Sequence, residues 1–185
     1  MSTRLNNAMV LICLYLAGSG QLRADGQYKH YSDDLRCGGA TARLETDCID
    51  VPDGRWECTG QSLHVHNSVT GLSRAVNLDE AAVVRPRVSP PRMLNGSVAA
   101  WNCIRSAAGV DYLLLVYACR GLMDNRCAGH GRSSEWSQIV TTDGQVVAGS
   151  RNDVDEAAER RLGLDMLLER RVPAIDVGPF ARVGK

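Results

Sequence analysis

Residues 99–147 read AAWNCIRSAAGVDYLLLVYACRGLMDNRCAGHGRSSEWSQIVTTDGQVV, and this stretch carries the clearest strand signals of the chain. Tyr112–Ala118 is an apolar run without polar alternation, which predicts a central strand buried on both faces. Downstream, Trp136–Thr142 and Gln145–Ala148 flank Asp143-Gly144, a pair that suits the type I′ turn of a β-hairpin. The stretch therefore predicts an antiparallel β-meander.

Upstream of this stretch, the chain shows the pattern of a sheet with one exposed face. A polar lead-in, Asp25–Asp34, predicts a short strand or an ordered arm. Three segments then place apolar residues at every second position, as strands do: Ala40–Thr46, Leu63–His66 and Leu72–Leu78. Asn67–Gly71 is a polar loop that ends in glycine, so the last two segments predict a hairpin. The proline-rich Arg85–Met93 predicts a surface connector, and Asn95-Gly96 predicts a turn.

The last part of the chain changes its hydrophobic period. Residues 153–171 predict a helix, because Asp153 suits an N-cap, Glu156 follows three residues later, and apolar residues recur near one face. Pro173 ends this helix, and Ala174–Val177 predict a last edge strand. Together the patterns predict a mainly β (α+β) fold: an antiparallel β-meander, sandwich or open barrel, braced by disulfides, with one C-terminal helix packed on it.

The N-terminus has the three-part layout of a secretory signal peptide. Arg4 supplies the positive charge, Ala8–Ala17 form an apolar run too short to span a bilayer, and small residues follow. We expect residues 1–24 to be removed on export, leaving residues 25–185 as a single β-rich domain that is periplasmic or secreted. The alternative is a buried N-terminal helix.

Six cysteines lie downstream of the predicted signal peptide, an even number that fits disulfides formed in an oxidising compartment. Cys48–Cys58 would close a turn, and Cys119–Cys127 would close a loop between two strands. These choices leave Cys37–Cys103 to tie the N-terminal part to the meander. Spacing alone leaves the other pairings open.

Size and charge narrow the classes of partner. With 185 residues the chain has room for one domain with its own core, so it needs no cofactor in order to fold. Its 21 basic and 21 acidic residues cancel, so no net field attracts nucleic acid or an anionic membrane. We expect no nucleic-acid partner, no cofactor and no membrane insertion after signal cleavage. The sequence leaves the oligomeric state open.

The loop Arg120–Arg132, held between two cysteines, is the candidate surface for binding a partner. A constrained loop loses less entropy on binding than a free one. Its candidate contact residues are Arg120, Met123, Asp124, Asn125, Arg126, His130 and Arg132. The alternative is a solvated loop that is closed only for stability. Trp101 and Trp136 lie at strand positions and are predicted to belong to the core rather than to anchor a partner.

A few side chains are candidates for a catalytic or metal site. His64 and His66 are two residues apart on a predicted strand, so they point to the same face and, with His130, could bind zinc. Solvated histidines are the stronger interpretation, so no metal site is predicted. The serine and cysteine motifs of known nucleophiles are missing from the sequence, and carboxylates such as Asp33-Asp34 and Glu135 occur in any chain of this length. No catalytic residue is therefore predicted.

The order of these features resembles that of small exported proteins of Gram-negative bacteria. The resemblance spans Trp101-x-Cys103, Tyr112–Tyr117, the following loop with Gly, Asn and Cys, Glu135-Trp136 and Asp143-Gly144. It departs in that loop, where Cys127 has no second cysteine close by. Some proteins of this kind are periplasmic immunity proteins to antibacterial effectors. The resemblance implies a domain that binds and neutralises a toxin or enzyme in the cell envelope. A periplasmic hydrolase is the main alternative, and a structural envelope component is the third.

Overall fold

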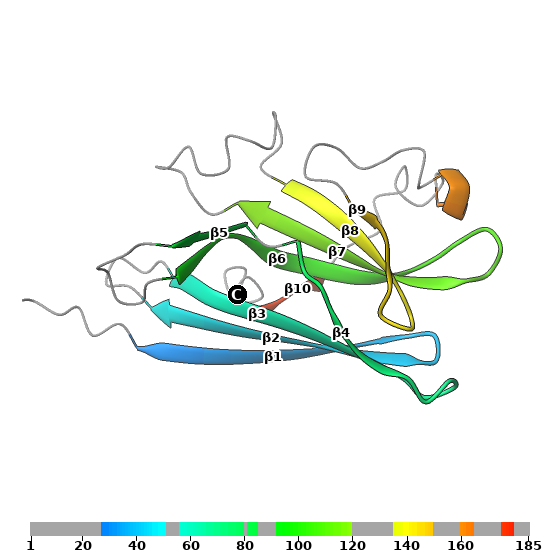
Figure 1. The fold of residues 1–185 in the computed structure, drawn as a ribbon, viewed down its shortest axis with the longest axis horizontal. Coiled ribbons are helices and arrows are strands. Elements are labelled where there is room, and N and C mark those ends of the chain that lie inside the picture. Colours follow the sequence, from blue (N-terminus) through cyan, green and yellow to red (C-terminus); the bar gives the residue numbers. More distant parts are fainter. Residues whose placement is uncertain are drawn as a thin grey trace, which may run out of the picture.

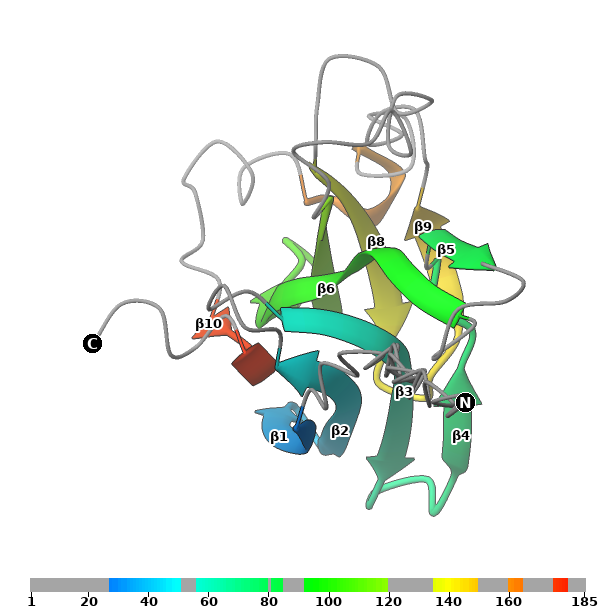
Figure 2. The ribbon, with the colours of Figure 1, turned by 90° about the vertical axis from the view of Figure 1, so that its left-hand side faces the viewer.

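The computed structural model describes residues 27–50, 56–79, 81–84, 92–119, 135–149, 160–164 and 175–179. They form two antiparallel β-sheets that lie one over the other (Figures 1 and 2). The strands are β1 (Tyr28–Cys37), β2 (Ala40–Asp50), β3 (Trp56–Asn67), β4 (Ser73–Val76), β5 (Ala81–Val84), β6 (Arg92–Arg105), β7 (Asp111–Cys119), β8 (Glu135–Thr141), β9 (Val146–Gly149) and β10 (Ile175–Asp176). The predicted mainly β fold is confirmed.

The strand order of each sheet follows the predicted hairpins. One sheet has four strands in the order β1-β2-β3-β4, and the other has the order β10-β6-β7-β8-β9, with β5 paired to β6. β7 contains Tyr112–Ala118 and lies between β6 and β8, which confirms it as a central strand. β6 to β9 form the predicted meander, and β10 confirms the predicted edge strand.

The two sheets share one hydrophobic core. Alternation on β2 buries Ala42 and Leu44 against the facing sheet and leaves Arg43 exposed. The largest side chains of this core are Leu44 and Leu63 from one sheet, and Trp101, Leu113, Leu115, Tyr117 and Trp136 from the other. Trp136 stacks on Tyr117 with ring centroids 5.2 Å apart. Both tryptophans are therefore core residues, as predicted.

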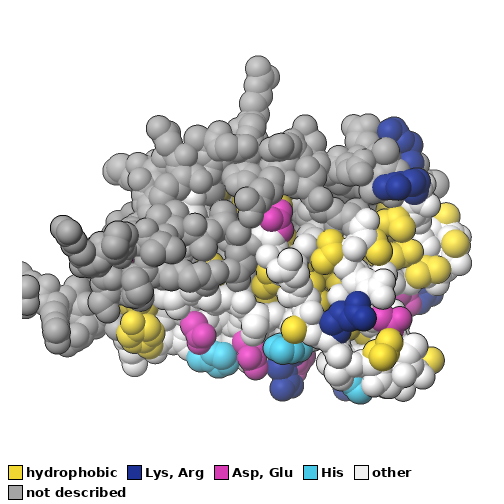
Figure 3. All heavy atoms as spheres, viewed as in Figure 1, with side chains coloured by type: hydrophobic (Ala, Val, Ile, Leu, Met, Phe, Trp, Pro, Cys, Tyr) yellow, Lys and Arg dark blue, Asp and Glu magenta, His cyan; other side chains and the backbone are white. Residues whose placement is uncertain are grey.

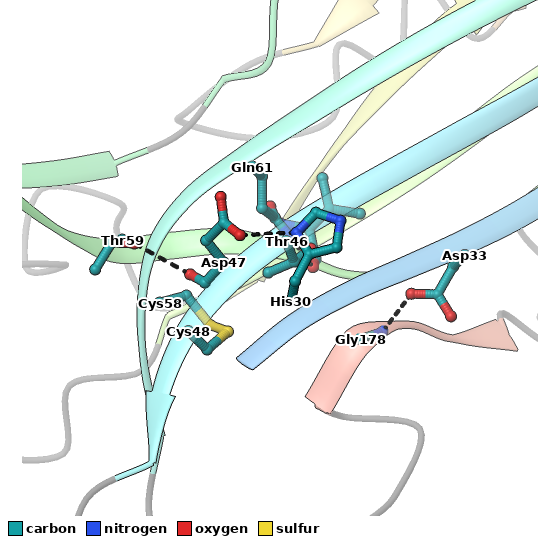
Figure 4. Close-up of a disulfide and its surroundings, with 10 residues drawn as sticks. His30, Asp33, Thr46, Asp47, Cys48, Cys58, Thr59, Gln61 and Gly178 are labelled. Atoms are coloured by element: carbon teal, nitrogen blue, oxygen red, sulfur yellow. Dashed lines mark hydrogen bonds and ion pairs between the residues drawn. A yellow bond between two sulfur atoms is a disulfide. The ribbon is translucent and has the colours of Figure 1, made fainter. Parts of the chain in front are cut away.

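Two of the predicted disulfides are confirmed. Cys37–Cys103 joins the end of β1 to β6 and so connects the two sheets. Cys48–Cys58 joins β2 to β3 at an irregularity in their register (Figure 4). Cys119 is disulfide-bonded as well, and its predicted partner Cys127 lies outside the described residues. Disulfides persist in oxidising compartments, so they indicate an extracytoplasmic environment.

The second face of β7 is covered by a segment from the C-terminal part. Leu114 packs there in a cluster with Ile104, Ile139 and Leu164. Residues 160–162 are helical, and Gly163, with a φ of +67°, follows them. A left-handed glycine ends a helix, so the prediction of one continuous helix over 153–171 is wrong. The rest of that range lies outside the described residues.

Two predicted turns differ from the structure. Asn95-Gly96 lies inside β6. A Cβ atom at Gly96 would lie 2.1 Å from Trp136 Cη2, so glycine makes room for the indole ring rather than for a turn. Asp143-Gly144 does join β8 to β9, but the N–H of Gly144 donates to the carbonyl of Thr141, and the N–H of Thr141 donates to that of Gln145. With a φ of +76° at Gly144, this geometry is typical of a three-residue hairpin loop, not of a type I′ turn.

Some sequence predictions concern residues beyond this description. The predicted signal peptide, residues 1–24, lies outside the described residues, and the connector Arg85–Met93 is described only at its last two residues, which begin β6. Within the described part of the chain, no helix has the length and apolar character needed to cross a membrane.

Candidate functional site

The structure brings together four loops that the sequence did not identify as one surface. They are residues 38–39, 68–72, 106–110 and 142–145, and they connect β1 to β2, β3 to β4, β6 to β7 and β8 to β9. All four lie toward the same end of the molecule, at the right in Figure 1. These four loops are called the hairpin row below.

The loop predicted to bind a partner lies elsewhere in the chain. Residues 120–132, with all seven candidate contact side chains, fall outside the described residues. Cys119, which precedes this loop, ends β7, whereas Asp111 begins β7 beside the hairpin row. The hairpin row therefore lies at the Asp111 end of β7, and Cys119 is the last residue of β7 at its other end.

The first link in the hairpin row joins the β8–β9 loop to the β3–β4 loop. Asp143 Oδ1 accepts a hydrogen bond from Asn67 Nδ2 at 2.8 Å and another from Thr70 Oγ1 at 3.0 Å. Asn67 Oδ1 in turn accepts the backbone N–H groups of Val69 and Thr70, at 2.9 and 3.2 Å. One buried amide thus orders its own loop and ties it to the next loop.

The second link joins the β3–β4 loop to the β1–β2 loop. Ser68 donates two hydrogen bonds to the carbonyl oxygen of Gly39, from its backbone N–H at 2.9 Å and from its hydroxyl at 2.8 Å. A Cβ atom at Gly39 would lie 2.5 Å from Val69 Cγ2, so the loops touch directly. A side chain at position 39 would therefore require the Val69 side chain to move.

The third link joins the β1–β2 loop to the start of β7. A Cβ atom at Gly38 would lie 2.7 Å from Asp111 Oδ2, so the carboxylate packs against this turn. Arg105 Nε and Nη2 donate to the two carboxylate oxygens of Asp111, at 2.6 and 3.0 Å. This hydrogen-bonded pair lowers the pKa of Asp111. The Cys37–Cys103 disulfide lies next to this link in the sequence and joins β1 to β6.

The hairpin row exposes large apolar side chains on this ordered backbone. Val69 is 81% exposed, and Leu72 and Val110 are each 48% exposed. Figure 3 shows hydrophobic side chains gathered at this end of the molecule. Apolar side chains exposed on loops with an ordered backbone can supply contact area to a binding partner.

The outer face of the four-stranded sheet carries a second feature, a shallow depression of about 640 Å³. It is lined by Asp34, Thr41, Arg43, His64, Val65, His66, Ser73, Arg74 and Ala75. Arg43 Nε and Nη2 donate to the two oxygens of Asp34, at 2.8 and 3.1 Å, and this contact lowers the pKa of Asp34. The depression is therefore lined by histidines and by an ion pair that is already formed.

The candidate metal and catalytic residues are only partly brought together. His64 and His66 share the exposed face of β3, and His66 Nδ1 lies 2.8 Å from Ser73 Oγ. His130 lies outside the described residues. Asp33 faces away from these histidines and accepts the N–H of Gly178 at 2.8 Å (Figure 4). Within the described ranges, no three His, Cys, Asp or Glu side chains are grouped so that they could hold a metal ion.

Sequence reasoning placed Asn67 and Asp143 in loops but did not connect them. The available signal was chemical, because Asn and Asp side chains often hydrogen-bond to nearby backbone and order turns. Comparison of the chain with protein-family models, curated proteins and solved structures finds no match. Its function is therefore inferred from its own surfaces.

Proposed function

We propose that this chain is an exported domain that binds another protein in the periplasm or outside the cell, and that it neutralises a toxin or enzyme acting in the cell envelope. The hairpin row is the observation that carries the proposal. Loops that are already ordered by hydrogen bonds lose little conformational entropy on association, so more of the contact energy contributes to affinity.

The composition of the hairpin row supports a protein as its ligand. Val69, Leu72 and Val110 supply apolar contact area, while Ser68 and Thr70 provide polar groups between them. Interfaces between proteins combine apolar centres with a polar surround in this way. The Cys37–Cys103 disulfide holds the strands beneath the row together, which suits an exported binding domain.

The test is a binding measurement on variants of the hairpin row. The partner is taken from the periplasm of the native host or from the product of the neighbouring gene, and affinity is measured with immobilised protein. Val69→Asp combined with Leu72→Asp should weaken binding at least about tenfold, since truncating or charging a central apolar contact typically costs more than about 1 kcal/mol. Ile175→Asp is the matched control, because Ile175 is equally apolar and 54% exposed but lies on β10.

The same assay separates the hairpin row from the predicted loop. If Arg126→Ala weakens binding and the Val69 and Leu72 changes do not, the partner uses loop 120–132 instead of the hairpin row. Neutralisation is then measured by co-expressing the chain with the captured toxin or enzyme and following survival or activity. A captured partner whose activity is unaffected by a saturating amount of the chain would contradict the inhibitory role.

A second candidate function, a periplasmic hydrolase, is favoured by the contact between His66 Nδ1 and Ser73 Oγ at 2.8 Å. A histidine beside a serine hydroxyl can act as its general base. Both residues line the depression, so a substrate would have access to them. A fluorophosphonate probe, which labels activated serines, should then modify Ser73 and fail to modify the Ser73→Ala variant. Absence of labelling in the unmodified chain argues against the hydrolase.

A further inference from the structure

We propose that β1 pairs with β1 of a second copy of this chain, so that two four-stranded sheets join edge to edge around a twofold axis at Ser32. This inference does not depend on the partner proposed above. β1 is the edge strand of its sheet and, among the described strands, pairs only with β2. It has ten residues, against four in β4 at the other edge, and it runs along the lower margin of the molecule in Figure 1.

The hydrogen-bonding pattern of the β1–β2 hairpin determines which backbone groups of β1 point away from β2, toward the open edge of the sheet. Cys37 pairs with Ala40 across the two-residue turn at Gly38-Gly39, and the pair that closes such a turn is hydrogen-bonded. Hydrogen-bonded pairs recur at every second residue of an antiparallel ladder. The odd-numbered residues of β1 therefore bond to β2. The even-numbered residues, from Tyr28 to Arg36, present their N–H and C=O groups at the open edge.

β1 lacks two of the features that prevent edge-to-edge pairing, prolines and bulges, although it carries charged residues such as Lys29 and Asp33. It contains no proline, and its register with β2 runs through ten consecutive pairs without a shift. The ladders of β2 with β3, β5 with β6, β6 with β7 and β8 with β9 all contain a register shift. Natural edge strands are commonly protected by bulges or prolines. A long, regular edge is a template for a further strand.

The sequence of β1 is complementary to itself when it is read in the antiparallel direction about Ser32. In that register Ser32 faces Ser32 of the second copy, His30 faces Asp34, and Tyr28 faces Arg36. The His30–Asp34 and Tyr28–Arg36 contacts each occur twice by symmetry, and the Ser32 contact lies once on the axis. All five residues with outward backbone groups take part, so this register also gives the longest overlap. An imidazole facing a carboxylate and an arginine facing a tyrosine ring are both favourable cross-strand pairs.

Charged side chains beside the junction of the two β1 strands continue the pattern of opposite charges into both sheets. Within one copy, His30 Nδ1 contacts Asp47 Oδ1 at 2.8 Å, and Arg43 is paired with Asp34. Across the junction between the two β1 strands, the side chains then follow one another in the order Asp47, His30, Asp34 of the second copy and Arg43 of the second copy. When His30 is protonated, negative and positive charges alternate along these four side chains. A register shifted by two residues in one direction would place His30 opposite Arg36, both of them basic. A shift by two residues in the other direction would place Arg36 beyond the end of the second copy's β1, where no strand residue faces it.

Cysteine cross-linking tests both the pairing and its register. In the full chain, expressed with export to an oxidising compartment, Ser32→Cys places two thiols opposite each other, and Cα atoms in a hydrogen-bonded pair lie about 5.5 Å apart. That distance allows a disulfide. We expect Ser32→Cys to form a covalent dimer on mild oxidation. Arg36→Cys is the control on the same exposed edge, because its two copies would lie about 26 Å apart along the strand.

Sedimentation velocity on proline variants provides the second measurement. The unmodified chain should sediment as a dimer at micromolar concentration. Ser32→Pro, which removes an outward N–H but no bond to β2, should sediment as a folded monomer. Ala75→Pro is the matched change on β4 at the opposite edge and should leave the dimer intact. A monomer for the unmodified chain up to about 100 μM, or equal cross-linking of Ser32→Cys and Arg36→Cys, would overturn the proposal.

Discussion

The side-chain amide of Asn67 donates a hydrogen bond to Asp143 Oδ1 at 2.8 Å, joining two hairpins across 76 residues of sequence. Asn67 is only 6% exposed, so its amide has little access to water as an alternative partner. Its own Oδ1 orders the backbone of Val69 and Thr70. The pair therefore couples the order of two loops of the hairpin row.

Removing this carboxylate should destabilise the domain. We expect Asp143→Ala to lower the free energy of unfolding by about 2 kcal/mol, because Asn67 Nδ2 and Thr70 Oγ1 both lose their acceptor. Asp143→Asn keeps an acceptor oxygen and should cost less than about 1 kcal/mol. Urea unfolding followed by tryptophan fluorescence measures both. Equal losses in the two variants would show that the hydrogen bonds are not the source of the effect.

The two described disulfides should contribute unequally to stability. Cys37–Cys103 closes a sequence separation of 66 residues and Cys48–Cys58 one of 10. A longer loop loses more entropy in the unfolded chain, so replacing the first pair by serine should cost about 4 kcal/mol and the second about 3 kcal/mol. Denaturant unfolding of the two double variants gives both values. The reverse order would contradict the entropic explanation.

Gly96 should resist any larger side chain. In Gly96→Ala the new Cβ would lie 2.1 Å from Trp136 Cη2, and such overpacking costs about 1–3 kcal/mol. Trp136→Phe removes the atom that clashes. The cost of Gly96→Ala should therefore be smaller in the Trp136→Phe background, as measured by a double-mutant cycle of thermal unfolding. Additive losses would place the strain elsewhere.

The pKa of His30 should depend on its cross-strand contact with Asp47. The hydrogen bond that the imidazole of His30 donates to the Asp47 carboxylate raises the pKa of His30 above its usual 6.5. The contact therefore stabilises the fold below pH 6.5 and loses this effect as the pH rises through the raised pKa. We expect Asp47→Ala to return the pKa, measured by NMR, toward 6.5, and Glu45→Gln, which removes a weaker charge effect, to lower it less. The pKa is measured in the Ser32→Pro background, in which no second copy is expected to face His30, and a pKa that stays high in Asp47→Ala there would refute this assignment.

Much of the fold could be predicted because its causes are local. Alternating burial at Ala40, Ala42 and Leu44 follows from the two-residue period of a strand, and the unbroken apolar run in β7 follows from its cover on both faces. The Cys48–Cys58 pairing was predicted because the two cysteines, 10 residues apart, flank one turn. The turn predicted at Asn95-Gly96 failed because the glycine there is needed by Trp136, a residue far away in the sequence.

The hairpin row, in contrast to the fold, could not be predicted from local patterns in the sequence. The sequence by itself predicted polar turns at Ser68 and Asp143 and next to Asn67, the last residue of β3, because such side chains favour turns over strands. Only the tertiary structure decided that these loops form one row, since the contacts that hold it join residues up to 76 positions apart. Such contacts depend on how two sheets pack face to face. The packing is set by the shapes of all core side chains together, and no local pattern in the sequence encodes it.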